Sequence, residues 1–298
     1  MLSKIKQYFK DRRIKKLRKS LPLLGDLSTR GCANLVDIES KKPLNACREL
    51  NERIQHSKNL SGHFSQSGIG AAIHFNDVLQ YYPDLAMMID ENVSGLVKDY
   101  LGGAGKIDAV YLGVFNTRGS ENTKVTNDSG LFHHDSVGNR LKLFIPINMD
   151  GNADYPTLYM KGSNLQKWKT HVNPTKHGIR ISTDMMNQWE EMSVVVPFGG
   201  RYIFDTNGAH RGEYRVSSEY RAILQFEFSA AENLGFGQIG PNNFSMQQTS
   251  FDFLNKSGLL REQNCEQEKK NIVHKGLPHR AKDVSFTSLK MIEGHNAI

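Results

Sequence analysis

One stretch of the sequence carries its most specific pattern, Leu131-Phe-His133-His134-Asp135. At the end of a strand, His133 and Asp135 point to the same side, because side chains alternate along a strand with a period of two. A further candidate ligand, His210, follows another predicted strand. Two histidines and one carboxylate on one face of a metal ion leave neighbouring positions open, which suits non-haem Fe(II). The pattern therefore predicts a metal site in a protein built largely of strands.

An arginine close to the last histidine makes this pattern more specific. Arg221 comes eleven residues after His210, inside the predicted strand Tyr220–Phe228. From that strand its guanidinium can point into the same cavity and hold a carboxylate with two parallel hydrogen bonds. A surface cation on an edge strand is the alternative interpretation of Arg221.

The spacing of the hydrophobic residues changes near residue 107 from helix-like to strand-like. Before it, Asn45–Gln55 and Asp84–Leu101 have the spacing of amphipathic helices, with Asn45 as the predicted N-cap. After it, segments rich in β-branched and aromatic residues predict strands at 110–115, 141–147, 157–160, 192–197, 201–204 and 220–228. Helices followed by a run of strands favour a mainly β protein, an antiparallel sandwich with flanking helices.

Charge is distributed unevenly along the chain of 298 residues, whose net charge is +7. Residues 1–20 hold nine basic residues and one acid, so the remainder is close to neutral. We predict a basic amphipathic arm over 1–20, one domain over 21–254 and a polar C-terminal extension over 255–298. The near-neutral body argues against nucleic acid as a partner. The arm predicts contact with an anionic membrane surface, and a solvated or docked helix is the alternative.

Cysteine content and hydropathy indicate the cellular compartment of the protein. The three cysteines are odd in number and have no metal-like spacing, which favours a reducing, cytoplasmic compartment. No run approaches eighteen consecutive apolar residues, so we expect no membrane-spanning segment. Together with the basic arm, these features predict a cytoplasmic protein that binds peripherally to the inner face of the membrane.

About half of the chain, from Asn76 to Glu227, resembles the phytanoyl-CoA dioxygenase family of Fe(II)- and 2-oxoglutarate-dependent oxygenases. In Thr157-Leu-Tyr-Met-Lys-Gly-Ser-Asn164, the sequence looks like the family's Pro-Gly-Ser-His stretch with Lys161 and Asn164 substituted. The resemblance also rests on the helix that begins at Pro83 and ends before Gly102-Gly103, on Phe132-His-His-Asp135 with the strand Leu141–Asn148, and on His210-Arg-Gly with Arg221.

This resemblance implies a double-stranded β-helix core, the jelly-roll or cupin-like fold. In that core His133, Asp135 and His210 would hold Fe(II), and Arg221 would pair with the distal carboxylate of 2-oxoglutarate. The resemblance also implies that His134 reaches this co-substrate. Halogenating relatives lack the carboxylate ligand, so the presence of Asp135 favours hydroxylation of a C–H bond with O2.

The substrate is predicted less directly. Arg211 and Arg215 lie at the mouth of the predicted site, where they either recognise an acidic substrate or are simply solvated. With the basic arm, they favour a small-molecule or lipid-linked sugar substrate, such as a Kdo sugar of lipopolysaccharide. A soluble metabolite or an acyl-CoA is the alternative substrate.

Two other classes of function compete with the oxygenase. Zn(II) also accepts two histidines and an aspartate, so a cupin-like isomerase or a zinc hydrolase fits the metal pattern. Hydrolysis needs no carboxylate clamp, so Arg221 favours the oxygenase. The other alternative is a membrane-surface adaptor with a degenerate oxygenase fold, against which the intact set of His133, Asp135, His210 and Arg221 argues.

Overall fold

The computed structural model describes residues 25–35, 38–58, 60–64, 68–103, 105–119, 130–135, 140–166, 181, 183–217, 219–230, 244–260, 282–283 and 286. The predicted arm over 1–20 lies outside these residues, as does most of the predicted extension over 255–298. The division into arm, domain and extension therefore stays a prediction. In the described part of the chain, no helix is long and apolar enough to cross a membrane.

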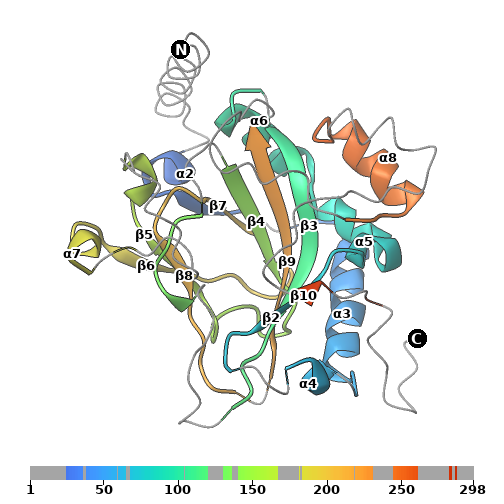
Figure 1. Cartoon of the computed structure of the whole chain (residues 1–298). Coiled ribbons are helices and arrows are strands. Elements are labelled where there is room, and N and C mark those ends of the chain that lie inside the picture. Colours follow the sequence, from blue (N-terminus) through green and yellow to red (C-terminus); the bar gives the residue numbers. More distant parts are fainter. Residues whose placement is uncertain are drawn as a thin grey trace.

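Two sheets make up the body of the protein (Figure 1). The larger has the order β1-β7-β4-β9-β3-β2-β10, and the smaller has the order β6-β5-β8. Neighbouring strands are antiparallel except β10 and β2. The strands are β1 Cys32–Asn34, β2 Ala72–Phe75, β3 Gly105–Phe115, β4 Arg140–Pro146, β5 Thr157–Met160, β6 Glu191–Val194, β7 Tyr202–Asp205, β8 His210–Gly212, β9 Arg221–Ala230 and β10 Lys282–Asp283.

Helices cover one face of the larger sheet, and the smaller sheet lies on its other side (Figure 1). Residues of α3, η2, α6 and α8 pack into the core on that face, whereas α7 lies beside the smaller sheet. The helices of the described residues are α2 Gly25–Thr29, α3 Lys41–Gln55, α4 Leu60–His63, α5 Val78–Tyr81, η2 Pro83–Met88, α6 Glu91–Tyr100, η4 Ser163–Leu165, α7 Thr183–Met186 and α8 Gln248–Lys256. This arrangement confirms the predicted fold class, a mainly antiparallel β protein with flanking helices and a jelly-roll core. Each predicted strand is present, with ends that differ by a few residues.

Alternation along β9 separates the hydrophobic core from the site. Ala222, Leu224, Phe226 and Phe228 belong to the large core cluster that also contains residues of α3, η2, α6 and α8. The residues between them, including Arg221 and Glu227, therefore point to the opposite side, toward the smaller sheet. The interior between the two sheets thus receives charged side chains from a strand whose other face is fully apolar.

The predicted helix over 84–101 is wrong in its middle. The structure has η2, which ends at Met88, and then α6, which begins at Glu91. Asp90 causes the break, because its Oδ1 accepts a hydrogen bond at 2.9 Å from the amide of Val93 and so caps a new helix. The predicted start of α3 at Asn45 is also wrong, since α3 begins at Lys41 and Asn45 lies inside it.

Candidate metal centre

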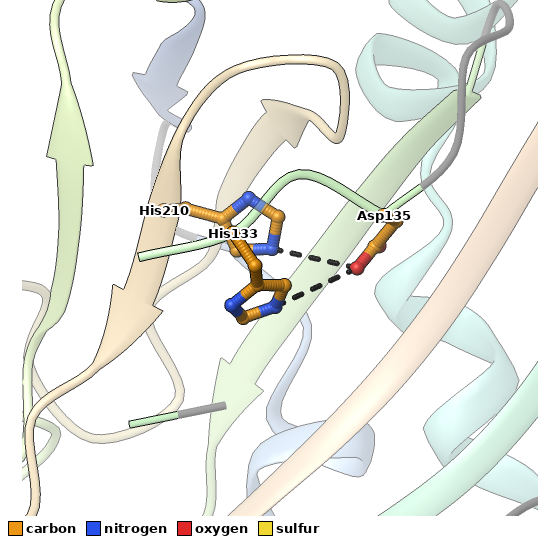
Figure 2. Close-up of side chains that lie close together, drawn as sticks. All are labelled: His133, Asp135 and His210. Carbon is orange, nitrogen blue, oxygen red and sulfur yellow. Dashed lines mark ion pairs between the residues drawn. The ribbon is translucent and has the colours of Figure 1, made fainter. Parts of the chain in front are cut away.

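His133, Asp135 and His210 come together between the sheets, as Figure 2 shows. Their ligand atoms all lie within 4.8 Å of one another. Backbone pairing brings them there: His133 and His210 exchange two antiparallel hydrogen bonds, of 3.0 and 2.8 Å, and the Asp135 amide donates to the Thr206 carbonyl at 3.0 Å. The segment with the His-x-Asp pattern thus runs beside β8, and its period of two turns both ligand side chains toward His210.

Backbone carbonyls select the tautomer of both histidines. His133 Nδ1 lies 2.7 Å from the Leu131 carbonyl oxygen, and His210 Nδ1 lies 2.9 Å from the Gly208 carbonyl oxygen. A carbonyl oxygen only accepts, so each Nδ1 must carry the proton. Each Nε2 is then left with a lone pair, which is how metal-binding histidines are commonly held. Both Nε2 atoms lie 3.7 Å from Asp135 Oδ1.

Burial and charge hold His210 and Asp135 in the protonation states that a cation needs. Burial and, after it, the neighbouring His133 ring lower the pKa of His210 to about 3, although the Asp135 carboxylate acts in the opposite direction. Burial raises the pKa of Asp135, but the Lys142 ammonium and the two histidines outweigh it, so that the net shift is downward. Near neutral pH the site therefore offers a neutral His210 and an ionised Asp135, and a metal ion displaces no proton from them.

Arg221 lies on the same side of the smaller sheet as His210. Its Nη2 donates to Thr157 Oγ1 at 3.3 Å, and Thr157 pairs with Gly212, two residues beyond His210 on β8. A methyl group at Gly212 would collide with Arg221 Nη1, so the guanidinium lies directly over this glycine. The Thr157 hydroxyl also shares a hydrogen bond of 2.7 Å with the Tyr202 hydroxyl. A cation and two hydroxyls thus form a buried polar cluster on the strand face that also carries His210.

The other predicted site residues are placed differently. His134 stands between His133 and Asp135 in the sequence. Its side chain is buried, but it does not belong to the group of three residues whose ligand atoms converge. Arg211 pairs with Leu158 and stacks over Phe132 at 5.2 Å, on the face of the smaller sheet opposite to His210. Arg215 is largely exposed and lies 3.7 Å from Glu213. The roles proposed for His134, Arg211 and Arg215 stay predictions.

A buried charged network next to Asp135 was missed as part of the site. Lys142 Nζ lies 2.8 Å from Asp135 Oδ2 and 3.2 Å from Glu227 Oε1. Arg140 Nη2 binds Glu227 Oε2 at 2.6 Å, and the Tyr111 hydroxyl donates to Glu227 Oε1 at 2.9 Å. The sequence did contain a signal, because two otherwise largely apolar strands carry charged residues on one face: Arg140 and Lys142 are two residues apart in β4, and Arg221 and Glu227 are six residues apart in β9.

The donor set fits a divalent transition metal. It consists of two imidazole nitrogens and one carboxylate oxygen, converging from adjacent backbone segments. Three protein ligands leave further positions for other molecules, the arrangement typical of non-haem Fe(II) and also compatible with Zn(II). The buried guanidinium of Arg221 is a group that can bind a carboxylate through two parallel hydrogen bonds.

Comparison with known proteins shows which solved structures share this fold. No model of a known protein family matches the chain, and no curated protein is significantly similar to it in sequence. Among solved structures, AviO1 from Streptomyces viridochromogenes Tue57 is 14% identical with a TM-score of 0.50, over 70% of this chain and 93% of AviO1. The epimerase SnoN in complex with Fe3+, alpha-ketoglutarate and nogalamycin RO is 10% identical with a TM-score of 0.50, over 74% of this chain and 85% of SnoN. This chain has their fold.

Proposed function

We propose that this protein is a non-haem Fe(II)- and 2-oxoglutarate-dependent dioxygenase that hydroxylates a C–H bond of a small molecule. The observation that carries the proposal is the position of the Arg221 guanidinium over Gly212, on the strand face that also presents His210 to His133 and Asp135. A metal-binding triad alone fits several chemistries, but a buried cation beside it fits a carboxylate co-substrate. The fold shared with SnoN, solved with Fe3+ and alpha-ketoglutarate, supports the same assignment.

Each residue has a defined task in this proposal. His133, Asp135 and His210 hold Fe(II), and the two backbone carbonyls on their Nδ1 atoms keep the imidazoles oriented. Arg221 and the Thr157 hydroxyl bind the distal carboxylate of 2-oxoglutarate, with Tyr202 behind Thr157. Burial of Arg221 and His210 excludes water from this part of the site. Iron with 2-oxoglutarate and O2 supplies the oxidative chemistry, in which 2-oxoglutarate becomes succinate and CO2 while one oxygen atom enters the substrate.

An anaerobic titration tests this proposal. Fe(II) and then 2-oxoglutarate are added to the metal-free protein, and the weak visible charge-transfer band of the metal with the chelating keto acid is followed. We expect the band in the wild type, its loss in His210→Ala, and a weaker affinity for 2-oxoglutarate with retained Fe(II) binding in Arg221→Met. Tight Zn(II) binding without any such band would contradict the oxygenase and favour the zinc hydrolase.

We propose a small molecule as the substrate and, more specifically, a lipid-linked sugar. The structure of SnoN contains nogalamycin RO, a small molecule, which is consistent with the coarser proposal. The lipid-linked form, and a membership of the phytanoyl-CoA dioxygenase family, rest on the sequence features described above. Turnover with candidate sugars, followed by mass spectrometry for one added oxygen atom, separates hydroxylation from an epimerisation that leaves the mass unchanged.

The basic arm provides a separate test of the membrane-borne substrate. Deletion of residues 1–20 should abolish sedimentation of the protein with anionic phospholipid vesicles, because each basic residue near the surface contributes about 1 kcal/mol to binding. Iron binding by the shortened protein should equal that of the full chain. A shortened protein that still sediments would exclude the arm as the membrane anchor.

A further inference from the structure

We propose that Lys142 is a positioning residue for Asp135: its ammonium occupies one carboxylate oxygen, so that Asp135 offers only the other oxygen to the metal. The inference rests on the proposed metal centre and extends it to a residue outside the ligand set. It predicts a property of metal binding itself, which can be measured without substrate and without turnover.

The two oxygens of Asp135 have separate surroundings. Oδ1 lies 3.7 Å from Nε2 of His133 and 3.7 Å from Nε2 of His210, on the side where the three ligand atoms converge. Oδ2 lies 2.8 Å from the Lys142 ammonium. The attraction between opposite charges at this distance favours the rotation of the carboxylate about its Cβ–Cγ bond that keeps Oδ2 toward the ammonium. The contact therefore separates a metal-facing oxygen from a lysine-facing oxygen.

Lys142 is itself held from behind by a second carboxylate. Its Nζ lies 3.2 Å from Glu227 Oε1, and Glu227 in turn binds Arg140 at 2.6 Å and the Tyr111 hydroxyl at 2.9 Å. Lys142 and Glu227 are directly paired residues of β4 and β9, in the centre of the larger sheet. Their backbones are therefore fixed by the sheet, and the Glu227 carboxylate restrains the position of the Lys142 ammonium.

The composition of this network favours a positioning role over a purely stabilising one. It contains two cations, Arg140 and Lys142, and two carboxylates, Asp135 and Glu227, so its formal charges balance. Buried ion pairs of this kind are on average no more stabilising than apolar side chains of the same size. What they do provide is orientation, and partners of metal ligands typically contribute about 10- to 100-fold to metal affinity.

The contact with Lys142 determines how many coordination positions of the metal Asp135 can occupy. A carboxylate with both oxygens available can chelate a metal ion and so occupy two coordination positions, whereas one with a single available oxygen occupies one. If Lys142 keeps Oδ2 engaged, the centre retains a position that 2-oxoglutarate or O2 requires. Removal of the ammonium is then expected to alter both the affinity for metal and the number of ligands around it.

The test uses Co(II), whose visible absorption reports the coordination number. In the full-length protein, Lys142→Met should weaken Co(II) binding by about 10- to 100-fold in calorimetry and change the Co(II) spectrum. Lys142→Arg, which keeps the charge, should restore most of the affinity. The matched control is Lys161→Met, which removes a lysine of similar pairing, 2.8 Å from Glu190, at the surface; it should bind Co(II) like the wild type.

A second variant covers the case in which Lys142→Met fails to fold because Glu227 loses a counter-charge. The double change Lys142→Met with Glu227→Gln removes one cation and one anion, so that the formal charges of the network still cancel, and the new amide keeps an oxygen that can accept from Arg140. It should fold and still show the weakened affinity and altered spectrum. Wild-type Co(II) affinity and spectrum in a folded double variant would overturn the role of Lys142. A wild-type protein that binds no Co(II) would overturn the metal centre itself, and the positioning role with it.

Discussion

Replacing Gly212 by alanine should weaken 2-oxoglutarate binding while leaving the fold and the metal ligands in place. The added Cβ would fall inside the contact distance of Arg221 Nη1 and would lie 3.1 Å from the Tyr214 hydroxyl oxygen. The Arg221 guanidinium already lies 5.4 Å from the ring centres of Phe115 and Tyr214 and 3.3 Å from Thr157 Oγ1. It must therefore retreat from the new methyl group by about 1 Å to restore normal contact.

The size of the effect follows from that displacement. Loss of one hydrogen bond between a charged donor and a carboxylate costs about 1.5–3 kcal/mol, which corresponds to an affinity about 10- to 100-fold lower. An added methyl group in a packed interior costs the fold about 1–3 kcal/mol. At Gly212 we expect the lower end, because the group that must move is the far end of a flexible side chain. That loss is well below the total stability of a typical domain, so the variant should remain folded.

Calorimetric titration of 2-oxoglutarate into the anaerobic Co(II)-loaded protein measures the effect, and Co(II) affinity serves as the internal control. The matched variant is Gly95→Ala in α6, where an added Cβ meets no atom within 4 Å, and it should bind 2-oxoglutarate like the wild type. A folded Gly212→Ala protein with wild-type affinity would refute the placement of the co-substrate at Arg221. An equal fall in Co(II) affinity would instead mean that the change disturbs the metal ligands.

Asp90→Ala should destabilise the protein by about 2–4 kcal/mol in urea unfolding, because it leaves the buried Arg201 without its ion pair of 2.8 Å and removes the cap of α6. Asp90→Asn, which keeps an oxygen for the cap, should lose about 1 kcal/mol less, and equal losses would rule out the cap. Burial raises the pKa of both Cys32 and Cys47 to about 12. In a Cys265→Ser background at pH 8, about one thiol in ten thousand is then a thiolate, so a disulfide reagent should react only after denaturation, and rapid labelling of the native protein would contradict this.

Much of the fold was predictable because local patterns report local structure. The segment Thr157–Met160 alternates and is rich in β-branched and aromatic residues, and it forms β5 with the predicted ends. The helix over 84–101 was predicted as continuous because its apolar spacing is continuous. Apolar spacing contains no information on the two contacts that break the helix. Asp90 Oδ1 accepts a hydrogen bond from the amide of Val93, and Asp90 Oδ2 pairs with Arg201, a residue far along the chain.

By itself the sequence determined the candidate ligands. A period of two turns His133 and Asp135 to one side, and this geometry holds in any strand-like segment. The place of His210 beside them was decided by the backbone pairing of His133 with His210. The position of Arg221 over Gly212 and the opposite face of Arg211 were decided by the pairing of β5 with β8 and the facing of the two sheets. The same holds for Lys142, which contacts Glu227 across β4 and β9 and also contacts Asp135. Such contacts depend on the register between distant strands, which the whole fold sets and no single segment encodes.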